Sequence, residues 1–368
     1  MKIVVAYALA GAGHFKAAES VYEFFREKNP ALEVELVDVL PLSGGLFRKS
    51  YAPVYDFMVN HANWLWALGF KLTGLKLFSK LVFLFHSLIC RANTVKLADF
   101  LIKGKPDYII STHFLPSVVV SSLKARGKIN SKLITVITDF GVHPFWIAPF
   151  TDIYVVASEF TAKQLEAKGV NQEIIRDWGI PVSSKFLNPP DKKNLYVKFG
   201  IRPDNFTVLI ATGSFGIGPI EEMADSLSVD NQVLVVCARN KKLYKKLKAK
   251  ENSNLKVFGF VNNMDELMAV SDIIIAKPGG LSISEILAME LVPLFISAIP
   301  GQETHNLEVL IKHGIGEEIN GPEQIRQIIK SYKNDPGKVS GVKENIRKFS
   351  KSYAVGELYE FICSGSDK

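Results

Sequence analysis

The chain has 368 residues, of which 48% are hydrophobic and 22% are charged. This composition excludes disordered and fibrous proteins, and the length exceeds the roughly 250–300 residues at which a single core stops growing, so we expect two domains. The net charge of +7 suits either an ordinary soluble protein or one that is attracted to anionic lipid. No compact basic cluster with interleaved aromatic residues is present, so we do not expect nucleic acid as a partner.

The cysteines and the N-terminus point to a cytoplasmic protein. Cys90, Cys237 and Cys363 are odd in number and widely spaced in apolar surroundings, which predicts reduced thiols in a reducing compartment. The apolar N-terminus is short and is followed at once by Gly11-Ala-Gly-His14, so a first strand explains it better than a signal peptide. No apolar stretch reaches the ~18 uninterrupted residues that span a bilayer.

Short β-branched runs alternate with amphipathic stretches along the chain. We predict strands at residues 3–7, 33–39, 108–111, 133–138, 153–157, 207–211, 232–237, 255–258, 272–276 and 293–296. Helical patterns at residues 16–28 and 282–289 lie between them. Strand–helix alternation predicts parallel sheets that are covered on both faces, and therefore an α/β fold.

The alternation occurs twice, with a break that is rich in proline and polar residues. We therefore predict two Rossmann-like, doubly wound domains over residues 1–182 and 206–344, joined by a linker over residues 183–205. One further helix is predicted over residues 345–361. The terminal segment, residues 345–368, is long enough to pack back on the first domain.

One stretch, residues 63–91, departs from the alternation because it is rich in Trp, Phe and Leu and is interrupted by basic residues. Such a composition is typical of a helix that lies in the plane of a membrane surface. A helix or helical hairpin buried against the domain core explains it equally well. The candidate membrane contacts are Trp64, Trp66, Phe70, Lys71, Lys76 and Phe78.

The segment over residues 272–306 contains the clearest ligand-binding pattern. A strand runs into Lys277-Pro278-Gly279-Gly280, and a helix with Leu281, Ser282 and Glu285 follows. Glycines let the backbone approach a ligand closely, and the unpaired N–H groups at a helix start suit a phosphate. Glu285, one turn into the helix, is placed to accept hydrogen bonds from a ribose diol.

The next strand ends at a second polar turn, which contains Gln302 and Glu303 and is followed by Asn306. Ligands of open α/β sheets bind at the carboxyl ends of the strands. The two turns together therefore predict a binding site for a phosphorylated ligand, whereas either turn alone is also compatible with an ordinary tight turn.

The first predicted strand is followed by a glycine turn that contains Gly13 and His14. Lys16 stands where the third glycine of a dinucleotide fingerprint is expected, so the match is poor, although the pattern alone is also compatible with a dehydrogenase. His14 is a candidate general base or acceptor-binding residue. It is also placed to cap the helix that follows.

A second histidine-containing segment follows the strand predicted at residues 133–138. Asp139 is a candidate base, a candidate orienting group for His14, or a cap of its own loop. His143 and Trp146 are candidate acceptor contacts.

The first strand of the second half ends at Gly213-Ser214-Phe215-Gly216-Ile217-Gly218. Its glycines allow close approach to a sugar diphosphate, and Arg239 after the next strand is a candidate cation for that charge. Arg239 also suits the solvated face of the basic run over residues 239–250. The sequence contains no P-loop, HExxH, GxSxG or DxD motif, so we expect no metal cofactor.

The motifs at Gly11–His14, Thr138–Pro144, Gly213–Gly216, Lys277–Glu285 and Pro300–Asn306 occur in this order. Together they resemble the family of monogalactosyldiacylglycerol synthases and bacterial processive diacylglycerol glucosyltransferases, over nearly the whole chain.

The resemblance implies a GT-B fold with its active site in the cleft between the domains, a UDP-sugar donor, a lipid acceptor, and inversion without a metal. It implies that His14 contacts or deprotonates the acceptor hydroxyl and that Gly279 and Gly280 hold the diphosphate. By the same resemblance Glu285 binds ribose, Gln302 and Glu303 bind the sugar, and the backbone near Phe260 meets uracil. The expected enzyme is a hexosyltransferase attached peripherally to the inner face of an anionic cell membrane.

Glucose and galactose, and single and repeated transfer, remain alternatives, and the sequence does not address the oligomeric state. Two other functions also remain open. One is a related transferase with a polyprenyl-linked or soluble acceptor, and the other is a non-catalytic UDP-sugar sensor.

Overall fold

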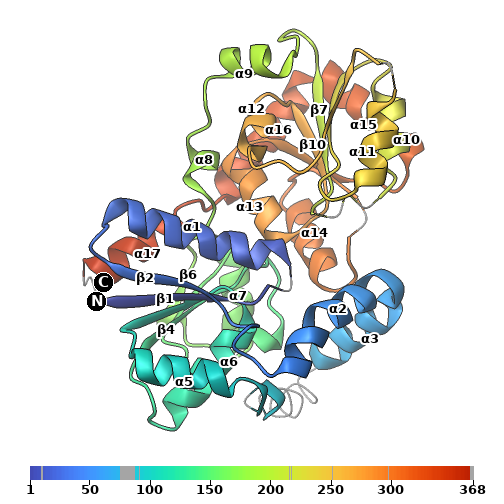
Figure 1. Cartoon of the computed structure of the whole chain (residues 1–368). Coiled ribbons are helices and arrows are strands. Elements are labelled where there is room, and N and C mark those ends of the chain that lie inside the picture. The colour runs from blue at the N-terminus through green and yellow to red at the C-terminus, as the bar shows by residue number, and fades with distance from the viewer. Residues whose placement is uncertain are drawn as a thin grey trace. The chain divides into compact units, whose positions relative to one another are not determined.

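The structure of the chain is a computed structural model. It describes residues 1–9, 11–74, 88–90, 92–214, 216, 218–250, 252–296 and 298–364. These residues form two units (Figure 1). The first contains Met1–Ser184, Ile299–His305 and Lys351–Lys368, and the second contains Lys185–Ala298 and Asn306–Ser350. Most of the segment predicted as a linker thus belongs to the second unit, where Phe186, Leu195 and Ile201 are part of a hydrophobic core.

The first unit is built on a parallel sheet with the strand order β2-β1-β3-β4-β5-β6. Its strands are β1 (Lys2–Tyr7), β2 (Glu33–Asp38), β3 (Tyr108–Ser111), β4 (Lys132–Val136), β5 (Ile153–Val155) and β6 (Ile175–Arg176). Val5 pairs with Leu36 on one side and with Ile110 on the other. The strand order reverses between β1 and β3, which is where a doubly wound sheet binds ligands.

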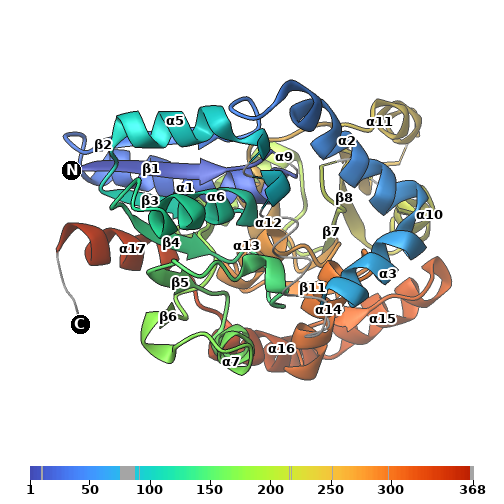
Figure 2. The same cartoon turned by 90° about the horizontal axis from the view of Figure 1, so that it is seen from below.

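Helices cover both faces of this sheet (Figure 2). The helices of this unit are α1 (Ala12–Lys28), α2 (Gly45–His61), α3 (Asn63–Gly74), α5 (Val95–Gly104), α6 (Phe114–Ala125), α7 (Glu159–Ala167) and α17 (Ala354–Cys363), with short 3-10 turns at Pro144–Trp146 and Gln172–Ile174. The C-terminal helix α17 packs on α1, and the rings of Phe25 and Tyr359 lie 5.3 Å apart. No described helix combines the length and apolar content that a bilayer span requires.

The prediction of one helix over residues 345–361 is wrong. Helix α16 (Pro336–Phe349) ends before Ser350, which is extended, and α17 begins at Ala354. Serines compete for backbone hydrogen bonds and therefore favour helix ends. The intervening backbone also packs closely against Gly179, because a Cβ atom at that glycine would lie 1.8 Å from the carbonyl oxygen of Lys351.

The second unit contains a parallel sheet with the order β12-β11-β10-β7-β8-β9. Its strands are β7 (Thr207–Ala211), β8 (Gln232–Val236), β9 (Leu255–Phe258), β10 (Ile273–Ala276), β11 (Val292–Phe295) and β12 (Glu317–Glu318). The order reverses between β7 and β10, where Ala211 pairs with Ala276. The predicted fold class, α/β with two Rossmann-like doubly wound domains, is confirmed.

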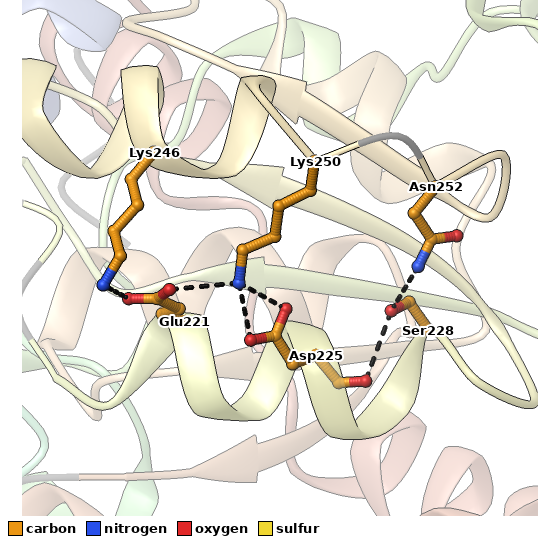
Figure 3. Close-up of polar contacts among 6 residues, drawn as sticks. All are labelled: Glu221, Asp225, Ser228, Lys246, Lys250 and Asn252. Carbon is orange, nitrogen blue, oxygen red and sulfur yellow. Dashed lines mark hydrogen bonds and ion pairs between the residues drawn. The ribbon is translucent and has the colours of Figure 1, made fainter.

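The helices in and around this second sheet are α8 (Ser184–Leu187), α9 (Lys192–Phe199), α10 (Ile220–Leu227), α11 (Lys241–Lys248), α12 (Met264–Ala269), α13 (Gly280–Ala288), α14 (Gln302–Lys312), α15 (Pro322–Asn334) and α16. The basic helix α11 and the lysine that follows it are tied to α10 by ion pairs (Figure 3). Glu221 accepts from Lys246 at 2.6 Å and from Lys250 at 3.0 Å, and Lys250 also pairs with Asp225. Part of the basic run is therefore used in packing helix on helix.

Candidate active site

The strand order of the first sheet reverses between β1 and β3. This brings together the turn with His14, which the sequence predicts as a candidate site, and the turn after β3, which it does not. His14 stands in the first turn of α1, directly after β1, and Thr112 and His113 follow the neighbouring strand β3. The backbone N–H of Thr112 donates to the carbonyl of Ala6 at 3.1 Å, which extends the strand pairing up to the site. The two turns are therefore held side by side by the sheet itself.

His14 is held by Thr112 and Thr138. Its Nδ1 lies 2.9 Å from the carbonyl oxygen of Thr112 and 2.9 Å from Oγ1 of Thr138. A carbonyl oxygen only accepts, so Nδ1 must carry the proton. The hydroxyl of Thr112 in turn donates to the carbonyl of His14 at 2.8 Å.

This arrangement leaves Nε2 of His14 as the basic nitrogen. Burial lowers the pKa of His14, while the negative charge of Asp139 and the hydrogen bond to Thr112 act in the opposite direction. The ring is therefore neutral near pH 7 and able to accept a proton, as a general base must.

His113 also lies at this candidate site, and no sequence motif indicates it. Its ring meets that of His14 edge-on, with the centroids 4.6 Å apart, and it is almost fully buried. Its Nδ1 accepts a hydrogen bond from the N–H of Leu115 at 3.0 Å and so caps α6. The available signal was its position, because Thr112 and His113 directly follow a strand at the point where the strand order of the sheet reverses.

Asp139 lies three residues beyond β4 and is buried. The sequence predicted that Asp139 directly follows the end of a strand, but β4 already ends at Val136. Its Oδ1 accepts a hydrogen bond from Nε2 of Gln302 at 2.7 Å, within the first unit. A predicted catalytic residue and a predicted sugar-binding residue are thus in direct contact.

The predicted acceptor residues His143 and Trp146 have different surroundings. Trp146 is buried, and its ring lies 6.1 Å from that of His14. His143 accepts from the N–H of Phe145 through Nδ1, so its Nε2 carries the proton and donates to the hydroxyl of Thr73 at 3.0 Å. Burial lowers the pKa of His143 to about 4, and the residue anchors helix α3.

Helix α3 has one inward and one outward face. The ring of Phe70 lies tilted against that of His143 with the centroids 4.4 Å apart, and Trp66 is also partly buried. Trp64 is 69% exposed, and Lys71 is also exposed. The outward apolar residues of α3 are Trp64, Leu65, Leu68 and Leu72. The other two candidate membrane contacts, Lys76 and Phe78, lie outside the described residues.

In the second unit, β10 leads into α13 through the turn that contains Lys277, Pro278 and Gly279. Gly279 is the N-terminal cap of α13 and has no side chain to offer, so the first N–H groups of the helix, at Gly280, Leu281 and Ser282, are available to an anion. Glu285 is partly buried in the second turn. The predicted donor residues of this turn thus share one helix end.

The turn from β11 into α14 supplies the other predicted donor residues. Gly301 has a φ of +93°, which favours glycine, and a Cβ there would meet the ring of Phe70 at 2.7 Å. A carboxylate oxygen of Glu303 accepts from the N–H of Ile299 at 2.7 Å and so shapes its own turn. Asn306 is fully buried and donates to the carbonyl of Pro278 at 3.0 Å.

The glycine loop after β7 packs on the loop after β8. The N–H of Arg239 donates to the carbonyl of Ser214 at 3.3 Å, and the side-chain amide of Asn240 donates to the carbonyl of Gly216 at 3.1 Å. Gly213 has a φ of +88°. Phe215 and Ile217 lie outside the described residues.

The side chain of Arg239 is exposed, as is 61% of that of Phe260. Within the part of the chain that the structure describes, no three His, Cys, Asp or Glu side chains are grouped to hold a metal ion.

Two family models match the chain. Residues 14–182 match monogalactosyldiacylglycerol synthase, and residues 207–337 match the glycosyltransferase family 28 C-terminal domain. A processive diacylglycerol beta-glucosyltransferase of Staphylococcus aureus strain bovine RF122 / ET3-1 is 30% identical over 344 residues, which are 90% of this chain and 85% of that protein. The chain belongs to the glycosyltransferase family of monogalactosyldiacylglycerol synthases and processive diacylglycerol glucosyltransferases. The relative of the same name from strain MRSA252 is 29% identical over the same shares of the two chains.

Solved structures agree with the fold of this glycosyltransferase. MurG of Acinetobacter baumannii is 14% identical with a TM-score of 0.59, over 98% of this chain and 99% of that one. MnaA of S. aureus with UDP is 13% identical with a TM-score of 0.64, over 98% and 96%. Family membership makes the chain a UDP-sugar-dependent glycosyltransferase, as the ordered motifs predicted.

Proposed function

We propose that this glycosyltransferase moves a hexose, glucose or galactose, from a UDP-sugar to diacylglycerol with inversion at the anomeric carbon and without a metal cofactor. The product is a glycolipid, made at the inner face of the cell membrane by a peripherally attached enzyme. The observation that carries the proposal is that one unit contains both His14, held by hydrogen bonds at the carboxyl ends of β1 and β3, and an exposed apolar helix, α3.

The donor binds through the second unit. The N–H groups at the start of α13 receive the diphosphate, and the two glycines before them let the phosphate approach the backbone. Glu285 accepts from the ribose hydroxyls. The charge that builds up on the leaving UDP is met by these fixed dipoles, which lowers the barrier without a bound cation.

The acceptor hydroxyl is activated by His14. Nε2 takes the proton from the hydroxyl, the hydroxyl oxygen forms a bond to the anomeric carbon, and the bond from that carbon to the UDP oxygen breaks. The resulting imidazolium is stabilised by the carbonyl of Thr112, to which Nδ1 donates, and by the charge of Asp139. A base of this kind contributes about 10²–10⁴-fold to the rate.

The chemistry of the donor and the names of the relatives support the proposed inversion. Sugars are α-linked in UDP-glucose and UDP-galactose, and the S. aureus relatives are named beta-glucosyltransferases. A single displacement converts an α-linked donor to a β-linked product, and one base and one leaving-group site are sufficient for it.

The lipid acceptor is supported by the surface of α2 and α3. In addition to the outward face of α3, helix α2 exposes Leu46, Val54 and Phe57, with Arg48 and Lys49 beside them. Exposed apolar and aromatic side chains flanked by cations suit the headgroup region of an anionic bilayer. An enzyme seated there meets diacylglycerol without extracting it into water.

The test is UDP release from a panel of UDP-sugars with vesicles that contain diacylglycerol, in the presence of EDTA. We expect release with UDP-glucose or UDP-galactose that depends on diacylglycerol. Release with a polyprenyl-linked or soluble acceptor instead, or no release with any donor, would contradict the proposal.

A further inference from the structure

We propose that Thr112 and Thr138 are positioning residues that fix the tautomer of His14 and so decide which nitrogen acts as the base. The inference rests on the proposed function, in which His14 accepts a proton. Neither threonine is assigned a contact with the reacting atoms, since both bond to Nδ1 of His14 and Nε2 accepts the proton.

Thr112 and His14 form a reciprocal pair of hydrogen bonds. The ring Nδ1–H of His14 donates to the backbone carbonyl of Thr112 at 2.9 Å, and the side chain of Thr112 donates to the backbone carbonyl of His14 at 2.8 Å. Two bonds between the same two residues fix both the main chain and the ring. The turn after β1 therefore cannot shift relative to the end of β3 without breaking both bonds.

Thr138 adds a second oxygen beside the same nitrogen. Its Oγ1 lies 2.9 Å from Nδ1, and the residue is 4% exposed. Because the carbonyl of Thr112 already requires a proton on Nδ1, Oγ1 of Thr138 shares that proton as a second acceptor. Moving the proton to Nε2 would set the Nδ1 lone pair against the lone pairs of the carbonyl, which is unfavourable.

The same geometry stabilises the charged ring during the reaction. When Nε2 accepts the proton, Nδ1–H becomes a stronger donor and both oxygens gain from it. This is the orienting role that a carboxylate plays in the serine protease triad, here performed by a backbone carbonyl and a hydroxyl. Asp139 contributes through its charge, which raises the pKa of His14.

The test compares Thr138→Val, which removes the hydroxyl at nearly constant volume, with Thr138→Ser, which keeps it. We expect Thr138→Val to lower kcat about tenfold, by analogy with the loss of a partner that orients a metal-bound histidine. The acid limb of the kcat/KM profile should move to lower pH, because the imidazolium loses an acceptor, and the KM for the donor should not change. Thr138→Ser should restore both values.

Thr135→Val is the matched control. Thr135 is also buried near the end of β4, and its hydroxyl bonds to Ser117 at 2.9 Å, away from His14. It should lose stability as Thr138→Val does, yet keep the wild-type pH profile. If both valine variants change the profile equally, or neither does, the proposal is overturned.

A second readout does not depend on activity. The ¹⁵N chemical shifts of the imidazole rings distinguish the two neutral tautomers, and the signal of His14 is assigned by its loss in His14→Gln. We expect the full-length wild-type protein to hold His14 with the proton on Nδ1, and Thr138→Val to raise the share of the other tautomer. A proton on Nε2 in the wild type would overturn this inference while leaving transferase activity, and hence the proposed function, intact. An inactive wild type with the proton on Nδ1 of His14 would contradict the proposed function and leave the tautomer assignment intact.

Discussion

The side-chain amide of Asn306 donates a hydrogen bond to the backbone carbonyl of Pro278 at 3.0 Å. Asn306 lies on α14, after β11, and Pro278 lies in the turn from β10 to α13. The bond therefore joins the two turns that the sequence analysis assigned to the donor. It holds the backbone just before the helix end that we propose receives the diphosphate.

Replacing Asn306 with alanine should loosen this turn. The carbonyl of Pro278 would lose a buried partner, which costs about 1–3 kcal/mol, and the donor KM should rise while the acceptor KM does not. Thermal unfolding and initial rates measure the two effects. Asn345→Ala is the matched control, since Asn345 donates to the carbonyl of Gly314 at 3.1 Å in an exposed part of the same unit. Equal effects on the donor KM of the two variants would show that the bond has no special role.

Glu285→Ala should weaken binding of UDP about tenfold or more, because hydroxyl groups bound to a carboxylate contribute about 1.5–3 kcal/mol each. Isothermal titration with UDP measures this loss. UDP binds without an acceptor, so the result is independent of catalysis. Glu290→Ala, on the same segment but paired with Arg347 at the surface, should bind UDP as the wild type does. Unchanged UDP affinity in Glu285→Ala would remove this residue from the donor site.

Trp64→Ser should reduce co-sedimentation with anionic vesicles several-fold, because the indole is 69% exposed on the outward face of α3 and suits the membrane interface. Tyr353 is 67% exposed in the same unit but outside α2 and α3, so Tyr353→Ser controls for the loss of an exposed aromatic ring. High salt should weaken the wild-type interaction further, since Lys71 contributes charge. Equal binding by the two variants would rule out α3 as the membrane contact.

The lowered pKa of His143 predicts how the free energy of unfolding depends on pH. Its pKa falls from 6.5 to about 4 in the folded protein, so the unfolded chain binds more protons between these values. Stability is therefore complete above about pH 6.5 and declines as the pH falls toward 4, by about 3 kcal/mol at most. His143→Gln should be less stable at pH 7 and should show a flatter decline in melting temperature below pH 6.5. The same replacement of the exposed His313 is the control, and a decline in His143→Gln as steep as in the wild type would contradict the assignment.

The central strands and the turns after β10 and β11 were predictable because their signals are local. Strands such as β1 and β10 are unbroken β-branched runs, and Gly279-Gly280 marks its turn without reference to any other segment. The edge strands β6 and β12 were missed because each has two residues, which is too short for a periodic pattern. The break at Ser350 was missed because a backbone contact with Gly179, distant in sequence, accompanies it.

At the candidate site, too, the sequence indicates residues that lie in local motifs but not their partners from distant segments. The glycine turn marks His14 as a candidate, whereas the partners of its ring lie 98 and 124 positions away along the chain, where spacing gives no guidance. His113 was overlooked because histidine is not a usual helix cap. The anchoring of α3 by His143 depends on Thr73, 70 positions away, so no local motif indicates this structural bond.

The identity of the lipid product shows whether the enzyme transfers a hexose to diacylglycerol. Wild-type protein, UDP-glucose or UDP-galactose and diacylglycerol vesicles should give a hexosyl-diacylglycerol whose anomeric proton coupling in NMR is that of a β-linkage, with one UDP released per hexose transferred. His14→Ala should lower the rate of product formation at least 100-fold and bind UDP normally. An α-linked product, a product on another class of acceptor, or full activity of His14→Ala would contradict the account.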